Sequence, residues 1–256
     1  SEMCIRDRSG VTDVGDGTYT ATITSTKAET VTVTAAIGDY DVTDKADVSF
    51  TATAATVANS TLTASPTTVA ADGTASSTMT LQAKDGNGNN LSAGGLTVTM
   101  SESGSATLSG VTDNSNGTYT ATITSTTAET VTVTAAIGGS NVTDTADVSF
   151  TATAATVTNS TLTASTATVA ADGVTTSTIT MQAKDANNNN LSAGGLSVTM
   201  SESGSATLSG VTDNSNGCLL YTSDAADDSL RVDLGGRSII IKLAVPSAAT
   251  VVGLAV

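Results

Sequence analysis

The sequence predicts an all-β protein built from tandem β-sandwich domains, and three observations carry this prediction. Residues 59–117 recur almost unchanged at 159–217, and residues 9–58 recur at 109–158, which is a repeat of 100 residues. A unit of this length is a small domain, because solenoid repeats have only about 20–50 residues. Apolar residues alternate with threonine along much of each copy, and Gly-containing turns separate the alternating stretches. No stretch shows helical periodicity.

The alternating stretches of the middle copy are predicted to be short strands. They cover residues 78–83, 97–100, 119–124 and 130–135, and Val148 and Phe150 extend the pattern. Each stretch has one apolar face and one threonine face, as expected of a half-buried antiparallel strand with β-branched residues on the wet side. Buried positions change between copies only within a size class: Met79 becomes Ile179, a swap that a packed core tolerates.

The turns between these strands also favour a sandwich. Asn116-Gly117 in the middle copy corresponds to Asp16-Gly17 in the first, and both dipeptides suit a tight hairpin with positive φ. Several short strands with such turns between them indicate a β-sandwich. The other turn signals are Asp72-Gly73, Asp85-Gly86-Asn87-Gly88, Gly94-Gly95 and Gly138-Gly139.

The best domain boundary lies near Ala52–Asn59, just after Phe50, and recurs near Ala152–Asn159. We therefore expect the C-terminal part of one domain at 9–51, a complete domain at 52–151 and the N-terminal part of a third at 152–217. The short, strand-like linkers favour an elongated rod. The two partial domains should expose sheet edges and half a core.

The repeat breaks at both ends of the chain. Residues 1–8 and 218–242 resemble translated sequencing-adapter DNA, since codons for Met3–Asp7, read on the opposite strand in another frame, encode Leu219–Thr222. We interpret both segments as adapter-derived and expect them to be unpacked. Residues 243–256 form an apolar tail that is shorter than the ~18 residues of a membrane-spanning helix, and it stays unassigned.

Composition excludes several classes of function. Both cysteines, Cys4 and Cys218, lie in the suspected adapter segments, so no disulfide framework is expected and the domains depend on their cores. Residues 9–217 contain 4 lysines and 18 acidic residues, a net charge of −14. This charge repels nucleic acid and anionic lipid. We expect neither nucleic-acid binding nor direct membrane insertion of this fragment.

The chain has no histidine and no tryptophan, so acyl-transfer triads and His/Cys metal sites are excluded. We predict no catalytic, cofactor-binding or metal-binding residues, and no cofactor. The acidic residues are expected to be solvated in turns and at strand ends, where carboxylate-only catalysis has no cleft. They are Asp72, Asp85, Glu102, Asp113, Glu129, Asp144 and Asp147.

Two regions carry acidic residues of the kind that bind calcium. Residues 85–89 resemble the start of a calcium loop, but Asn90 and Leu96 stand where a helix–loop–helix site needs glycine and a bidentate glutamate. We interpret the segment as a turn held by its own Asn and Asp side chains. Weak calcium binding at the domain junctions stays open, around Asp44, Asp47, Asp144 and Asp147.

The middle copy resembles a bacterial Ig-like (group 1) domain of the invasin/intimin adhesin family. The motifs are VAADGTASSTMTLQAKDGNGNNL, VTDNSNGTYTATITSTTAETVTVTA and DTADVSF, and the resemblance covers 52–151 fully and the flanking copies in part. It implies tandem Ig-like sandwiches in the extracellular stalk of an adhesin that is anchored in the outer membrane. Tyr119 and Tyr19 resemble the corner tyrosine of Ig-like sandwiches, a structural residue.

We therefore expect a fragment of a bacterial cell-surface adhesin whose domains act as spacer or adhesive modules. Its partner would be a receptor on a host or neighbouring cell. The alternative is a phage virion or carbohydrate-binding Ig-like module. Sugar binding usually requires clustered exposed aromatic residues, and only Tyr40, in one copy, could serve. An enzyme is the least favoured reading.

Overall fold

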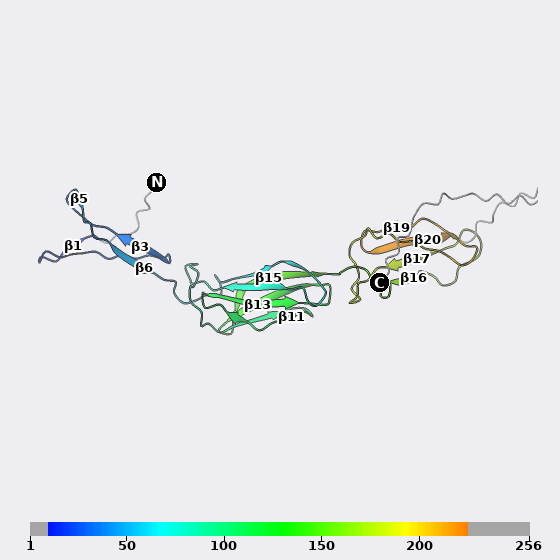
Figure 1. Ribbon diagram of the computed structural model, residues 1–256, viewed down its shortest axis with the longest axis horizontal. Coiled ribbons are helices and arrows are strands. Elements are labelled where there is room, and N and C mark those ends of the chain that lie inside the picture. Colours follow the sequence, from blue (N-terminus) through cyan, green and yellow to red (C-terminus); the bar gives the residue numbers. More distant parts are fainter. Residues whose placement is uncertain (1–9, 225–256) are drawn as a thin grey trace, which may run out of the picture.

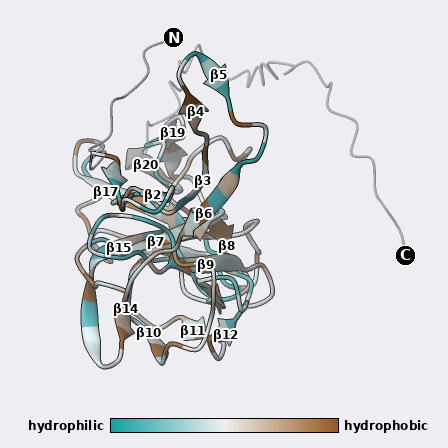
Figure 2. Cartoon of the chain, turned by 90° about the vertical axis from the view of Figure 1, so that its left-hand side faces the viewer, coloured by the Kyte–Doolittle hydropathy of each residue, from teal (hydrophilic) through white to brown (hydrophobic). Residues whose placement is uncertain are grey.

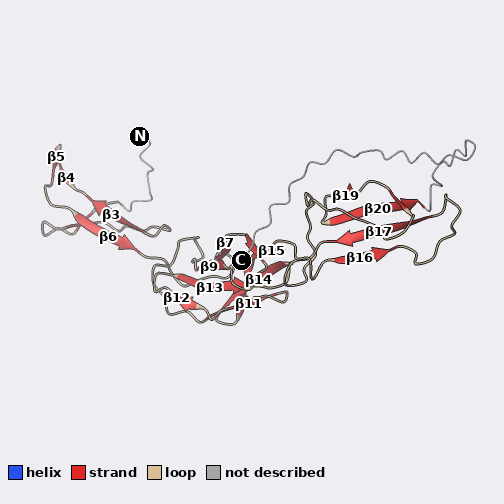
Figure 3. Cartoon of the chain, turned by 45° about the vertical axis from the view of Figure 1, so that its right-hand side comes forward, coloured by secondary structure: helices blue, strands red, loops and turns tan. Residues whose placement is uncertain are grey.

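The computed structural model describes residues 10–224, and within them the ordered elements are β-strands with no helix (Figure 3). The strands form three bodies in a row (Figure 1), which we call the first unit (10–51), the middle unit (52–151) and the third unit (152–224). We place the boundaries between these units where the 100-residue repeat begins again, and we propose them as domain boundaries. In residues 10–224, no helix is long and apolar enough to cross a membrane.

The middle unit is a sandwich of two sheets, as the alternating pattern predicts. One sheet has the order β10-β14-β15-β8, in which only the β15–β8 pair is parallel. Its strands are β8 (Thr68–Ala70), β10 (Val98–Glu102), β14 (Thr130–Ile137) and β15 (Ser140–Thr151). The other sheet has the order β11-β13-β9-β7, with β12 also paired to β13. Its strands are β7 (Thr61–Ser65), β9 (Ser77–Gln82), β11 (Thr107–Leu108), β12 (Thr112–Asp113) and β13 (Thr118–Thr124).

The core lies between these two sheets and takes alternate residues from each strand. Along β13 the burial pattern alternates, with Tyr119, Ala121 and Ile123 buried and the threonines between them more exposed. Met79 and Leu81 of β9 face Val131 and Val133 of β14 in the same apolar cluster. Val98 is only partly buried but packs against that cluster. The predicted all-β sandwich is therefore confirmed.

The first unit contains short pairs of strands from the same repeat. β3 (Glu29–Val33) pairs with β6 (Ala46–Phe50), at positions equivalent to β14 and β15. Two further hairpins are formed by β1 (Thr12–Asp13) with β2 (Tyr19–Thr20) and by β4 (Ala36–Ile37) with β5 (Tyr40–Asp41). The apolar strand β4, brown in Figure 2, lies beside the polar strand β5 at one end of the unit.

The third unit contains the complementary sheet, in the order β16-β17-β20-β18 with β19 paired to β20. Its strands are β16 (Thr161–Ala164), β17 (Thr176–Gln182), β18 (Thr207–Leu208), β19 (Thr212–Asp213) and β20 (Cys218–Asp224). These positions repeat the sheet of β7, β9, β11, β12 and β13. Within residues 10–224, the third unit therefore shows one layer of the sandwich, whereas the first unit shows pieces of both: β3–β6 from one sheet, and β1–β2, equivalent to β12–β13, from the other.

Equivalent residues show what the complete sandwich contributes. Tyr119 is 1% exposed in the middle unit, whereas Tyr19 is 65% exposed in the first. Leu62 is 3% exposed, whereas Leu162 in the third unit is 64% exposed. The expectation that the partial domains expose half a core is confirmed for these residues. Burial here depends on the rest of the sandwich and not on the local sequence: within residues 10–224, Tyr19 has no equivalents of β9 and β7 beside it, and Leu162 has no equivalents of β14 and β15 opposite it.

The expectation that residues 218–242 stay unpacked is wrong for the first seven. Residues 218–224 form β20, which pairs with β17 in the register that β13 has with β9: Cys218 lies opposite Gln182 as Thr118 lies opposite Gln82. The reason is that ladder hydrogen bonds are made by the backbone, and the turn at Gly217, with φ +75°, directs any following chain back along β17. Residues 1–8, 225–242 and 243–256 lie outside the described residues.

Two residues that the sequence singles out hold the hairpin at the start of β13. Gly117 has φ +81°, and a Cβ there would overlap the Leu91 carbonyl oxygen, so glycine is required. The Tyr119 hydroxyl accepts a hydrogen bond of 2.9 Å from the Leu96 amide. Its structural role is as predicted. Its partner, however, lies 23 residues upstream in the β9–β10 connection, whereas a corner tyrosine bonds only a few residues away.

Candidate functional site at the unit junctions

The acidic residues considered from sequence are spread over the middle unit, where most of them hold backbone amides. Asp72 accepts hydrogen bonds from the Ala75 and Thr74 amides, and those hydrogen bonds lower the pKa of its carboxyl. The other bonds are Gly95 N to Asp113 (2.7 Å), Ser105 N to Glu129 (2.9 Å), Leu62 N to Asp144 (3.0 Å) and Thr132 Oγ1 to Asp147 (2.7 Å). In the described part of the chain, no three or more His, Cys, Asp or Glu residues are grouped to hold a metal ion.

Asp85 is the exception to the solvated role that we predicted for these acids, because it is only 1% exposed. One carboxylate oxygen accepts the amides of Asn87 and Asn89, both at 2.9 Å. The other oxygen accepts the Thr53 amide at 3.0 Å and the Asn89 side-chain amide at 3.0 Å. The hydrogen bond from Asn89, followed by that from Thr53, holds the pKa of Asp85 well below its usual range. The prediction of a self-satisfied turn was right, but it missed the tie to the linker at Thr53.

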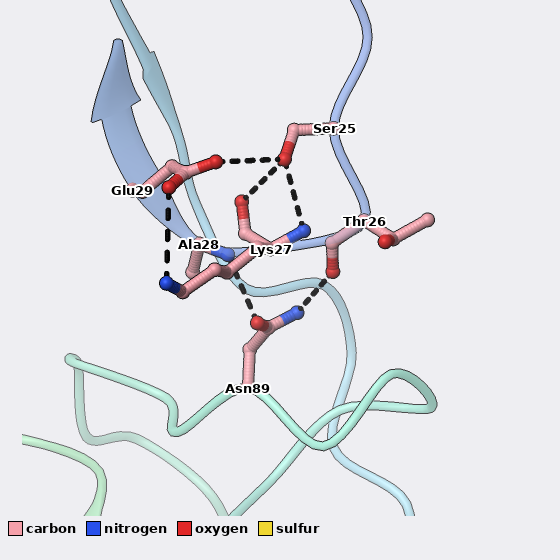
Figure 4. A network of polar contacts seen from close by, with 6 residues as sticks. All are labelled: Ser25, Thr26, Lys27, Ala28, Glu29 and Asn89. Carbon is pink, nitrogen blue, oxygen red and sulfur yellow. Dashed lines mark hydrogen bonds and ion pairs between the residues drawn. The ribbon is translucent and has the colours of Figure 1, made fainter. Parts of the chain in front are cut away.

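Asn89 extends this network to the first unit (Figure 4). Its Oδ1 accepts a hydrogen bond of 2.9 Å from the Ala28 amide, and its Nδ2 donates one of 2.9 Å to the Thr26 carbonyl oxygen. The side-chain amide thus pairs with one backbone donor and one backbone acceptor of the loop that precedes β3. Asp85 fixes the orientation of Asn89, since Nδ2 also donates to its carboxylate.

The junction between the middle and third units repeats this arrangement 100 residues later. Asn189 Oδ1 accepts the Ala128 amide at 2.8 Å, and Asn189 Nδ2 donates to the Thr126 carbonyl oxygen at 2.8 Å. Asp185 is fully buried and accepts the Thr153 amide at 3.0 Å. We call each set the amide clamp: Asp85 and Asn89 on residues 26–28, and Asp185 and Asn189 on residues 126–128.

The second clamp differs from the first in two respects. Burial disfavours the charged form of Asp185, but the hydrogen bonds from Asn189 and Thr153 outweigh burial, so its pKa is still lowered. In addition, Asn187 Nδ2 donates a hydrogen bond of 2.8 Å to the Ala71 carbonyl oxygen, just after β8. The third unit therefore holds two separate loops of the middle unit.

Sequence reasoning missed Asn89, Asn189 and the buried state of Asp85. A signal was present, because the loop keeps its Asp and its Asn residues in both copies while its glycines change, Gly86 to Ala186 and Gly88 to Asn188. The turn itself tolerates this change, since Asn188 keeps a positive φ (65°, against 81° for Gly88), so the retained Asp and Asn residues point to another role. The partner was hidden, since residues 26–28 lie more than 60 positions away and contribute only backbone atoms.

Comparison with known proteins finds bacterial adhesins, the class of protein that the sequence motifs resemble. The family model for invasin, domain 3, matches residues 56–153 and 156–235. FdeC, an Escherichia coli adhesin, is 30% identical with a TM-score of 0.52, over 85% of this chain and 72% of that one. InvD of Yersinia pseudotuberculosis is 27% identical with a TM-score of 0.51, over 65% of this chain and 49% of that one. No curated protein matches the chain.

The crystal structure of invasin, described as a bacterial integrin-binding protein, is 26% identical with a TM-score of 0.51. The match covers 81% of this chain but only 42% of the invasin chain, so the units correspond to less than half of that protein. The matched family residues cover more than half of the 256 residues. The chain therefore belongs to the invasin domain 3 family of bacterial adhesin domains.

Proposed function

We propose that the chain is part of the stalk of a bacterial cell-surface adhesin, in which the amide clamps hold successive Ig-like units in a fixed relative orientation. The observation that carries the proposal is the recurrence of the same clamp at both junctions, with the same donors and acceptors. A chain of independent domains on flexible linkers needs no such contacts. A rigid spacer does, because each junction must resist bending.

The linker itself adds to this rigidity. Thr53 is bonded to Asp85, and the Thr56 amide donates a hydrogen bond of 2.7 Å to the Lys84 carbonyl oxygen. The chain that enters the middle unit is therefore fixed within a few residues of Phe50. At a rise of about 3.3 Å per residue, the 12 residues of β15 measure about 40 Å, which sets the length that one unit adds to the row.

We further propose that the parent protein is extracellular, is anchored in the outer membrane and contacts a receptor on a host or neighbouring cell. Membership of an adhesin family supports this, as does the integrin-binding description of invasin. The net charge of −14 over residues 9–217 suits a spacer, since neighbouring stalks repel each other.

The carbohydrate-binding alternative is not favoured. Tyr40 is 83% exposed and Tyr19 is 65% exposed, but both belong to the first unit. In the middle unit, Ser140 replaces Tyr40, and Tyr119 is buried. A repeated sugar-binding surface would present its aromatic residues in every copy.

A test displays the chain on a bacterial surface between an anchor and an epitope tag, and compares it with a variant that lacks residues 52–151. The deletion removes one repeat and joins Thr51 to Ala152, which restores the natural junction sequence. We expect the mean height of the tag, measured by atomic force or super-resolution microscopy, to fall by about 40 Å. An unchanged height, or a broad distribution for both chains, would refute the spacer function.

A further inference from the structure

The chain enters and leaves the middle unit at opposite ends (Figure 1). β8 is the second strand of the unit, after β7, and β15 is its last strand before the third unit. The two strands are parallel, with Thr68 opposite Ser149, Val69 opposite Phe150 and Ala70 opposite Thr151. A pull on both ends of the unit therefore draws β8 and β15 in opposite directions along their common axis.

The contacts between these strands oppose such sliding. The Ser149 amide donates to the Thr67 carbonyl oxygen at 2.8 Å, and the Ala71 amide donates to the Thr151 carbonyl oxygen at 2.8 Å. The Thr151 hydroxyl adds a hydrogen bond of 3.3 Å to the Val69 carbonyl oxygen. Val69 and Phe150 are also buried in the core, so sliding would move both side chains out of their packing.

The entering segment is held by both sheets. Residues 61–65 pair with β9 in one sheet, and residues 68–70 pair with β15 in the other. The third unit acts on the same segment, because Asn187 donates to the Ala71 carbonyl oxygen at the far end of β8. Tension that draws the third unit away from the first therefore loads this hydrogen bond together with the strand pair.

We propose that the β8–β15 pair is a mechanical clamp, which gives the unit a high resistance to force applied through its ends. In this geometry the interstrand hydrogen bonds share the load and must break together. When the same strands are pulled apart sideways, the bonds break one after another. The biological use of this mechanical clamp rests on the proposed stalk function, because a stalk between two cells carries tension. The mechanical resistance itself follows from the strand geometry and does not depend on that function.

The test is single-molecule force spectroscopy of the full chain with two attachment geometries, in a background with Cys4→Ser and Cys218→Ser. Ala54→Cys with Ala154→Cys, both at exposed positions, loads the pair along its axis. Thr68→Cys with Ser149→Cys, which are register partners, loads it sideways. Released lengths of about 31 nm and about 28 nm, which are the extended lengths minus the folded separations of the attachment points, identify the middle unit in the two geometries. Equal denaturant midpoints show that both variants have the same stability.

We expect the unfolding force along the axis to exceed the sideways force by at least about twofold at the same loading rate, because several hydrogen bonds fail together. Thr151→Val, which removes the hydroxyl bonded to Val69, should lower the axial force and leave the sideways force unchanged. Equal forces in the two geometries would overturn the proposal. That result would leave the spacer function intact, because the height of a displayed tag depends on rigid junctions and not on unfolding force.

Discussion

Removing the side-chain amide of Asn189 should loosen the junction between the middle and third units without unfolding either one. Asn189→Ala deletes two hydrogen bonds that cross the junction, to the Ala128 amide and the Thr126 carbonyl oxygen, each 2.8 Å long. It also deletes the hydrogen bond of 3.0 Å to the Asp185 carboxylate, which lies within the third unit.

The magnitude follows from the two junction bonds. A hydrogen bond of this kind contributes about 0.5–1.5 kcal/mol net, so the fixed orientation should lose about 1–3 kcal/mol relative to other orientations. That free energy corresponds to an increase of about 5- to 150-fold in the ratio of reoriented to clamped molecules. Because the clamp atoms of the middle unit belong to the backbone of residues 126–128, its own fold loses nothing.

Single-molecule fluorescence energy transfer between dyes on the middle and third units measures this ratio. The parent chain should give one narrow distribution of transfer efficiency, and Asn189→Ala should give a broad or second one. Asn188→Gly is the matched control, because Gly88 occupies that position in the other copy and Asn188 is not part of the clamp. Identical distributions for the parent and Asn189→Ala would refute the reasoning that the amide clamp fixes the junction.

Three further outcomes are expected. Tyr119→Phe should destabilise the middle unit by about 0.5–1.5 kcal/mol in denaturant unfolding, since it removes the hydrogen bond to the partly buried Leu96 amide, whereas Tyr19→Phe, at an exposed position, should have no effect. Gly117→Ala should cost about 3 kcal/mol or more because of its positive φ and the close carbonyl, whereas Gly110→Ala meets open space and should fold normally. Hydrogen bonds from Thr175 and Val174 lower the pKa of Asp172 to about 2, so its contribution to stability is complete above about pH 4 and is lost as the pH falls through 2. The unfolding midpoint of Asp172→Asn should therefore change less between pH 5 and pH 2 than that of the parent chain, and an equal change would contradict this account.

The fold of the middle unit could be predicted because the same alternation of apolar residues and threonine recurs along several of its strands. The alternation around Tyr119 and Ile123 fixes which face is buried, and Asn116-Gly117 fixes where the hairpin turns. The alternation does not show whether the rest of the sandwich is present. Tyr19 stands in nearly the same local sequence as Tyr119, yet Tyr19 is 65% exposed and Tyr119 is 1% exposed.

The junction could be predicted only in part. The short linker indicated a rod, and the Asp85 loop was correctly interpreted as a turn bonded to itself. The contact with the neighbouring unit is made to backbone atoms of residues 26–28, and backbone atoms carry no sequence signal. For the same reason, the pairing of residues 218–224 with β17 was missed, because only the chain direction set by Gly217 governs it.

Small-angle X-ray scattering of the full chain in solution tests the central claim, that clamped units form a stiff row, most directly. Three units of about 40 Å make a rod of about 120 Å, whose radius of gyration is about 35 Å, with a single rod-like distance distribution. A compact arrangement of 256 residues would have a radius of gyration of about 18 Å. A radius of gyration near 35 Å, together with a distance distribution that broadens in the Asn189→Ala variant, supports the account. A radius of gyration near 18 Å, or a distance distribution that is the same in the parent chain and in Asn189→Ala, contradicts it.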